Sequence, residues 1–136
     1  MNNIEQTLSI IKPDAVERNL IEEIKSIFIR NDLRIKDNKK IHISKEEAAE
    51  FYKVHQSKPF YNDLCSYLSS GPIVVMILEG KDAIVKNRKI MGATDPKNAD
   101  ENTIRKLYGI SIDRNSVHGS DSSENAKKEI NFFFNN

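Results

Sequence analysis

The stretch NSVHGSDSSE, residues 115–124, holds a histidine in surroundings that suit chemistry. His118 follows a short apolar step and precedes a run of Gly, Ser and Asp, whereas a structural histidine usually lies inside an apolar pattern and an idle one among charges. An imidazole whose pKa is about 6.5 is neutral in roughly three-quarters of molecules at pH 7. A neutral ring nitrogen is a competent nucleophile toward phosphorus. His118 is therefore the candidate catalytic residue.

Cationic and hydrogen-bonding side chains, most of them in the second half of the chain, form a set that suits a polyphosphate. The members are Lys12, Arg88, Arg105, Thr94 and Asn115. Arginine offers forked donors that match phosphate oxygens, and lysine offers a compact point charge. The chain has five glycines and no GxxxxGK[ST] pattern. A nucleotide phosphate would therefore be held by side chains rather than by a backbone cradle.

A nucleophilic histidine needs a partner that fixes its tautomer and stabilises the positive charge that develops as it attacks. Glu129 is the candidate, because it borders the apolar stripe of the last predicted helix and could reach the preceding strand. That stripe consists of Ala126, Ile130 and Phe133. Ser120 could bridge His118 and Glu129. The alternative is that Glu129 pairs with Lys127 or Lys128 in water.

Other candidate residues also have ordinary structural interpretations. Arg88 on a helix is more often part of a solvated face, and Lys12 can simply mark the end of a strand. His42 alternates with two isoleucines and is interpreted as an outward-facing strand residue, and His55 as a solvated one. Cys65, the single cysteine, excludes an internal disulfide, and its apolar-periodic surroundings favour a core position over a reactive thiol.

The composition of the 136 residues is that of one globular domain. The chain is 38% hydrophobic and 30% charged, and its net charge of +1 gives no reason to expect nucleic acid or a membrane surface as a partner. The first ten residues, MNNIEQTLSI, lack the basic and apolar regions of a signal peptide. The longest apolar run, residues 73–78, is too short to span a bilayer. We therefore expect a cytoplasmic protein.

Hydrophobic periodicity predicts an alternation of strands and helices. Strands are expected at 5–12, at about 33–43, at 72–80 and near 115–119. Helices are expected over 19 to about 31, over 60–69 and over about 122–134, and Gly71 should close the second of these. Another helix should begin at Ser44, where SKEE is a capping box. A further helix should run from Asp82, its N-cap, to Met91, and end at Gly92. Residues 93–114 are interpreted as a long loop. The predicted fold class is α/β (α+β), a ferredoxin-like βαββαβ arrangement with an inserted helical hairpin, a long loop before the last strand and a C-terminal helix.

Six segments together resemble the nucleoside diphosphate kinase family. They are TLSIIKPDAVERN (7–19), KPFYNDL (58–64), SGPIVVMILEG (70–80), RKIMGATDP (88–96), NTIR (102–105) and NSVHGSDS (115–122). The NxxHGSD block is highly specific to that family, and the resemblance covers essentially all of residues 1–136. It implies a single nucleoside diphosphate kinase domain with a four-stranded antiparallel sheet.

The resemblance implies a ping-pong phosphotransferase in which His118 accepts the γ-phosphoryl group of a nucleoside triphosphate such as ATP and passes it to a nucleoside or deoxynucleoside diphosphate. By position, Lys12 and Asn115 would meet the sugar hydroxyls and adjoining phosphate oxygens. The β- and γ-phosphates would be held by Arg88, Thr94 and Arg105, with Mg²⁺ bound mainly by the phosphates and not directly by protein ligands. The base would be held by Phe60 on one face, Ile112 on the other and Leu64 as a support. The surroundings of His118 would be ordered by Tyr52, Ser120 and Glu129.

Departures from the family pattern lie in the predicted loop and at the end of the chain. Glu101-Asn102 stand where the family commonly has Pro-Gly, and Lys106-Leu107 where it commonly has Gly-Asp. The chain also ends at FFFNN, without the longer extension of many relatives. Because these regions meet at subunit contacts in the family, a homo-oligomer is expected and hexamer versus tetramer stays open. Two further alternatives are a phosphohistidine relay to proteins and a catalytically idle nucleotide-binding scaffold.

Overall fold

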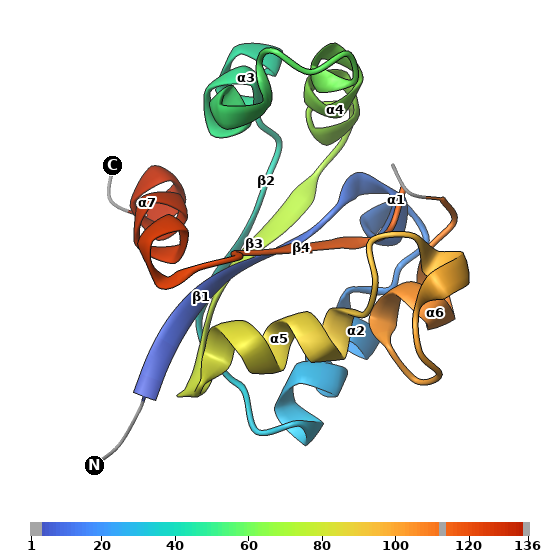
Figure 1. The fold of residues 1–136 in the computed structure, drawn as a ribbon, viewed down its shortest axis with the longest axis vertical. Helices are drawn as coiled ribbons and strands as arrows, with labels where there is room; N and C mark the ends of the chain where they lie inside the picture. The colour runs from blue at the N-terminus through green and yellow to red at the C-terminus, as the bar shows by residue number, and fades with distance from the viewer. Residues whose placement is uncertain (1–3, 112–113, 135–136) are drawn as a thin grey trace.

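The computed structural model describes residues 4–111 and 114–134, which form a sheet with helices on both faces (Figure 1). In chain order the elements are β1 (Ile4–Ile11), α1 (Pro13–Glu17), α2 (Ile21–Arg30), β2 (Arg34–Ile41), α3 (Lys45–Phe51), η1 (Lys53–His55), α4 (Tyr61–Leu68), β3 (Ile73–Lys81), α5 (Ala83–Met91), η2 (Pro96–Asn98), α6 (Ile104–Tyr108), β4 (Val117–Gly119) and α7 (Ser123–Phe134). None of the helices in this described part of the chain has the length and apolar character needed to cross a membrane.

The sheet has four strands in the order β2-β3-β1-β4, and every neighbouring pair is antiparallel. The predicted ferredoxin-like α+β fold is therefore confirmed. The apolar run that the sequence places at the sheet centre is β3, in which residues 73–78 are all buried. Strand β1 lies between β3 and β4, with Ile10 opposite Val75 on one side and His118 on the other. The predicted catalytic histidine therefore stands beside a central strand.

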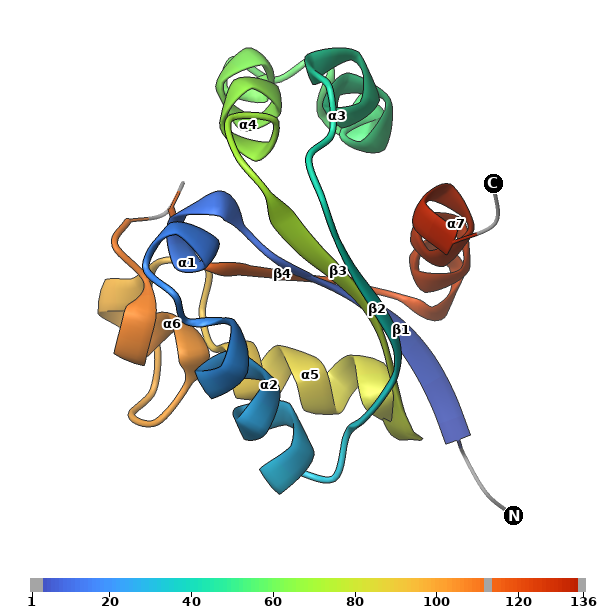
Figure 2. The same ribbon diagram turned by 180° about the vertical axis from the view of Figure 1, so that it is seen from behind.

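Two apolar clusters cover the two faces of the sheet. Strand side chains alternate between faces, so that Ile11 packs with α1, α2 and α5, whereas Leu8 and Ile10 pack with α3, α4 and α7. The two opposite views show α2 and α5 on one side of the sheet and α7 on the other, with the α3–α4 pair beyond one end of it (Figures 1 and 2). Phe28 on the first face and Leu68 on the second are fully buried. Apolar packing on both faces therefore fixes the sheet, and the sheet in turn positions the loops at its edge.

Several local signals in the sequence are confirmed. Ser44 caps α3 by accepting from the Glu47 amide at 3.1 Å, and the Glu47 carboxylate accepts from the Ser44 amide at 3.0 Å. Gly92 ends α5 with a φ of 88°, a conformation that glycine adopts at little cost. Cys65 is buried in the second cluster. These residues behave as their sequence context predicts.

One predicted helix end is wrong, and another is right in position but is capped differently. Gly71 does not close α4, which ends at Leu68 with Ser69 as its C-cap in a right-handed conformation. Asp82 stands at the N-cap of α5, but its side chain makes no capping bond there. The carboxylate of Glu5 accepts from the Ile84 amide instead, at 2.9 Å. A neighbouring strand supplies this cap, which local sequence cannot show.

The predicted long loop contains helices that the sequence analysis missed. Pro96–Asn98 form a short 3₁₀ turn, and Thr103 caps α6 by accepting from the Lys106 amide at 3.3 Å. Pro13 likewise both ends β1 and begins α1, because proline suits the first turn of a helix. The connection before β4 therefore contains regular secondary structure, and Arg105 lies on its α-helix, α6.

Candidate active site

His118 lies on β4, partly exposed, with its Nε2 3.1 Å from Glu129 Oε1. Because an ionised carboxylate can only accept, this contact assigns the ring hydrogen to Nε2. The lone pair is then on Nδ1. Phe51 of α3 meets the ring edge-to-face, with ring centroids 5.3 Å apart. Glu129 thus fixes the position of Nε2, and the Phe51 ring packs against the imidazole from the side.

Glu129 is itself held in place by Ser120. The Ser120 hydroxyl donates to Glu129 Oε1 at 2.7 Å and accepts from the Leu8 amide at 3.3 Å. The alternative partner Lys128 pairs with Glu124 instead, at 3.6 Å. The structure therefore brings together the histidine, the hydroxyl and the carboxylate that the sequence analysis singled out.

A strained turn leads into the histidine. Ser116 has a φ of 75°, and the Val117 amide donates to the Asn115 carbonyl at 2.9 Å, which together define a γ-turn centred on Ser116. A residue other than glycine in this region costs of order 1–3 kcal/mol and persists only where its surroundings hold it. The Ser116 carbonyl accepts from the Lys12 amide at 2.8 Å. This turn sets the relation between Asn115 and His118.

Lys12, Asn115 and Thr94 form a chain of contacts beside this turn. Lys12 Nζ donates to Asn115 Oδ1 at 2.9 Å, and Asn115 Nδ2 donates to the Thr94 carbonyl at 3.0 Å. Lys12 and Asn115 are 7% and 2% exposed, so that both side chains are held rather than free in solvent. Three residues that are far apart in the sequence are in this way joined at the end of β1.

Arg105 is buried and anchored by two backbone carbonyls. Its two terminal nitrogens donate to Gly92 O at 3.0 Å and to Val117 O at 2.9 Å. Burial, and then the neighbouring charge of Arg88, lower the pKa of Arg105 to about 10. Both effects oppose the charged form, and a bound anion would relieve them.

A cleft of about 630 Å³ opens over these cationic groups. Arg88, Thr94 and Arg105 line it together with Gly119, which follows the histidine. Asp100 is the one carboxylate among its described lining residues. A polyphosphate suits this cleft in size and in charge.

The predicted base-binding residues lie at the start of α4. Phe60 is the N-cap of α4 and is 43% exposed, and Leu64, one turn further on, is partly buried. Lys58 Nζ lies 5.8 Å from the centre of the Phe60 ring, and the His55 ring centre lies 6.1 Å from it. His55 is thus partly buried against a ring, although the sequence analysis interpreted it as solvated. Ile112 lies outside the described residues.

Tyr52 is buried at the C-cap of α3 and interacts electrostatically with Glu129. Burial is the largest cause that raises its pKa well above the ordinary value, followed by the charges of Cys65 and Glu129. The phenol is therefore neutral at physiological pH and is a hydrogen-bond donor. Its interaction with Glu129 is consistent with the predicted ordering role.

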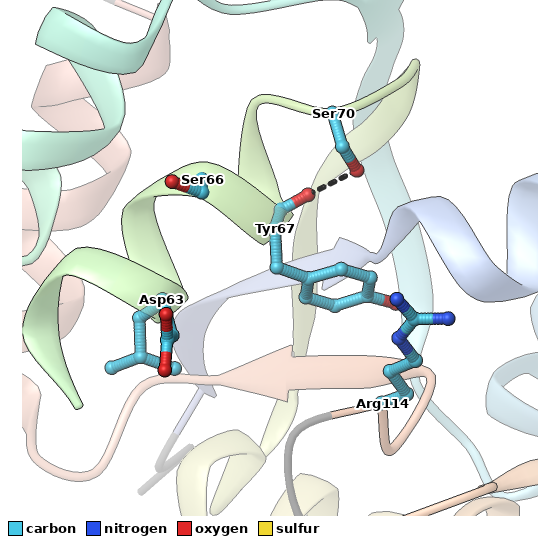
Figure 3. Close-up of a pocket in the computed structure, with 6 residues that line it drawn as sticks. Asp63, Ser66, Tyr67, Ser70 and Arg114 are labelled. Atoms are coloured by element: carbon cyan, nitrogen blue, oxygen red, sulfur yellow. Dashed lines mark hydrogen bonds between the residues drawn. The ribbon is translucent and has the colours of Figure 1, made fainter.

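A separate hollow of about 370 Å³ lies along α4 (Figure 3). Tyr67 and Arg114 line it side by side, with the guanidinium 5.5 Å from the centre of the tyrosine ring, and Ser70 donates to the Tyr67 carbonyl at 2.6 Å. Leu64 is the one predicted site residue among the described residues that line it. This hollow is therefore distinct from the phosphate cleft.

The family model described as nucleoside diphosphate kinase matches residues 5–136. The chain belongs to the nucleoside diphosphate kinase family. It is 60% identical over 131 residues to the nucleoside diphosphate kinase of a Nitratiruptor species, with 96% of each chain covered. The crystal structure of the Aquifex aeolicus nucleoside diphosphate kinase superposes with a TM-score of 0.95 at 42% identity and covers 96% of this chain and 95% of that one. The apo structure of the Encephalitozoon cuniculi enzyme has a TM-score of 0.93 at 37% identity, covering 97% and 90%. Members of this family are phosphotransferases.

Two features of this family member were not found by sequence reasoning. Phe51 was not among the candidate residues, although its ring contacts His118. Gly119, which follows the histidine, meets a steric requirement. A Cβ atom there would lie 2.3 Å from Asn87 Nδ2 and 2.7 Å from Met91 Cε. Helix α5 therefore packs directly on the backbone that follows the nucleophile.

Proposed function

We propose that the protein transfers the γ-phosphoryl group of a nucleoside triphosphate such as ATP to a nucleoside or deoxynucleoside diphosphate in two steps through His118. First, the Nδ1 lone pair forms a bond with the γ-phosphorus, the bond from that phosphorus to the bridging oxygen breaks, and the diphosphate leaves. Then a β-phosphate oxygen of a second diphosphate attacks the phosphorus, and the P–N bond breaks with its electron pair returning to Nδ1. The hydrogen on Nε2 stays in place throughout.

The observation that carries this proposal is the contact between His118 Nε2 and Glu129 Oε1 at 3.1 Å, together with the Ser120 bond that aims the carboxylate. Attack by Nδ1 makes the ring positively charged, and a carboxylate on the opposite nitrogen stabilises that charge. Tyr52 adds order to the same pocket. A covalent intermediate lets two nucleotides use one site in turn.

The phosphate groups would be held by Arg88, Thr94 and Arg105, with Lys12 at the sugar end. Phosphoryl transfer depends on positioning and on neutralising charge at the transferring oxygens, and Arg88, Thr94 and Arg105 line one cleft. Mg²⁺ would be held mainly by the nucleotide phosphates, since Arg88, Lys89 and Arg105 in the cleft suit phosphate oxygens rather than a cation. When bound, the ion would neutralise phosphate charge.

The nucleoside end would be held by stacking and by the sugar. Phe60 offers an exposed ring face, Leu64 would support it and Ile112 would cover the other side, whereas the joined pair Lys12 and Asn115 would meet the sugar hydroxyls. A base that is held by its face is not distinguished by its hydrogen-bonding edge. The proposed acceptors therefore include the diphosphates of all the common bases.

We also propose a single domain over residues 1–136 that works as a homo-oligomer in the cytoplasm, where its nucleotide substrates are found. Strand β2 supports the oligomer, because it is an edge strand in the single chain and an unpaired edge favours association. Light scattering distinguishes a hexamer from a tetramer.

Intact mass after mixing with Mg²⁺ and ATP, followed by a GDP chase, tests this function. The expected result is one acid-labile phosphate that GDP removes and that His118→Ala does not acquire. ATP binding without phosphorylation would favour an idle nucleotide-binding scaffold. Phosphate that GDP cannot remove would favour a relay to proteins. Arg88, Thr94 and Arg105 line one cleft, which favours the kinase over both alternatives.

A further inference from the structure

Asp14 is a carboxylate buried at the start of α1, 6% exposed, that the proposed reaction does not use. Its Oδ2 accepts from the Ser116 hydroxyl at 2.9 Å and from an Arg18 terminal nitrogen at 3.2 Å. Its Oδ1 accepts from the Tyr67 hydroxyl, which in turn accepts from the Asp14 amide at 2.9 Å. A buried carboxylate with this many donors is fixed in position.

The groups that hold Asp14 come from different parts of the fold. Tyr67 belongs to α4, and Arg18, which follows α1, also donates to the Tyr108 carbonyl at the end of α6. Burial and the Asp14 hydrogen bond raise the pKa of the Tyr67 phenol well above its ordinary value, so that it remains a donor. The carboxylate is therefore anchored to three helices before it reaches Ser116.

Ser116 is the centre of the γ-turn that separates Asn115 from the strand of His118. An alanine-like Cβ disfavours a φ of 75°, and the conformation has to be held by its surroundings. The Ser116 hydroxyl donates to Asp14 at 2.9 Å and accepts from Arg18, itself bonded to Asp14, at 3.3 Å. The Ser116 carbonyl accepts from the Lys12 amide at 2.8 Å. The side-chain bond is thus placed where it can oppose relaxation of the turn.

We propose that Asp14 is a positioning residue for phosphoryl transfer, which fixes the γ-turn at Ser116 and thereby the position of His118 relative to Lys12 and Asn115. The inference rests on the proposed function of His118. Asp14 touches no reacting atom and acts through Ser116. A small misplacement of a reacting group lowers rates steeply, so loss of the bond should appear in the chemical step.

The first test compares two substitutions at one position. Ser116→Ala loses the bond to Asp14 and keeps the Cβ, whereas Ser116→Gly loses the bond but adopts a positive φ freely. The single-turnover rate of His118 phosphorylation at saturating ATP and Mg²⁺ is measured by rapid quench and intact mass. We expect Ser116→Ala to be slower by about tenfold and Ser116→Gly to stay within about threefold of the natural chain. Equal losses in both variants, or no loss in Ser116→Ala, would overturn the proposal.

The second test asks whether Asp14 acts through the turn. We expect Asp14→Asn to lower the same rate by about tenfold and the double variant Asp14→Asn with Ser116→Gly to recover most of it. Glu17→Gln, an exposed change on the same helix, is the control and should keep the full rate. If the Asp14→Asn deficit persists in the double variant, Asp14 has only a structural role. Urea midpoints report the effect on folding separately, and if Asp14→Asn does not fold, the Ser116 pair still decides.

Failure of the proposed function gives a different result. In that case the natural chain itself would not acquire phosphate on His118. A natural chain that is phosphorylated, combined with unaffected Ser116→Ala and Asp14→Asn variants, rejects only the positioning role.

Discussion

The two ends of the proposed nucleotide site are built in different ways. At the phosphoryl end, Glu129 accepts from both His118 and Ser120, and Arg105 is anchored on two carbonyls. At the base end, Phe60 is 43% exposed and is held by ring contacts at an irregular turn between η1 and α4. This difference indicates that the transfer step needs side chains in fixed positions, whereas binding of the base does not.

Preorganised charges and hydrogen bonds lower a barrier because they need no rearrangement as charge develops. An exposed ring face, in contrast, binds any base with similar strength. The molecule therefore concentrates its order where the bond is broken and leaves the base end tolerant. Substitutions at the two ends should separate these properties.

The largest effect is expected for His118→Ala. Transfer should fall by roughly 10⁴-fold or more, because the nucleophile is lost. The fold and ADP binding should remain, since His118 is partly exposed and belongs to neither apolar cluster. Coupled nucleotide assays and calorimetry with ADP check this, and retained transfer would reject the nucleophile.

Arg105→Ala should follow, with turnover lowered by about 10²-fold and ADP affinity changed much less. Its charge matters most as the phosphoryl group transfers, because negative charge then spreads over the oxygens. Lys106→Ala, on the exposed side of the same helix, is the matched control. Equal losses in turnover and in ADP binding would place Arg105 in ground-state binding alone.

Glu129→Gln should lower turnover by about 10- to 100-fold and leave nucleotide binding nearly unchanged. The amide cannot stabilise the imidazolium by charge and no longer fixes the ring hydrogen on Nε2. Glu124→Gln removes a carboxylate from the same helix at an exposed pair with Lys128 and serves as the control. If both variants turned over alike, the role of Glu129 would be only that of a surface charge.

The smallest effect is expected at the tolerant end. Phe60→Ala should weaken all nucleotides alike, by roughly 1–3 kcal/mol, because it removes a stacking face. Binding of ADP, GDP, CDP and UDP by calorimetry tests this. A loss confined to one base would show that the base end reads more than a ring face.

Sequence reasoning predicted elements that depend on local signals. The Ser44 capping box, the apolar run of β3 and the stripe that borders Glu129 were sufficient to locate α3, β3 and the face of α7. The arrangement predicted for Ser120 is wrong: Glu129 meets His118 directly, and Ser120 bonds to the carboxylate instead of lying between the two. The assignments of residues to catalytic roles stay predictions. Pro13 held an unused signal, since a proline after a strand is also a good first residue of a helix.

What was missed depends on residues far apart in the chain. The cap of α5 comes from Glu5, 79 residues away, and Asp14 meets Ser116 across 102 residues. A γ-turn at Ser116 has no local signature, because serine does not favour a positive φ. Such features follow from packing between distant segments, and a single sequence does not show which distant residues come into contact.

The position of β1 has a consequence for how the protein is made. The strand at the start of the chain lies inside the sheet, and its contact with the β4 side, as in the bond between Leu8 and Ser120, spans 112 residues. Contacts of such long range close late, because the intervening chain must be ordered first. During synthesis on the ribosome, β1 is the first strand to be translated, and β4, one of its two neighbours in the sheet, is the last strand to be translated. The nascent chain therefore cannot assemble the contacts of His118 with Glu129 until translation has passed β4 and α7.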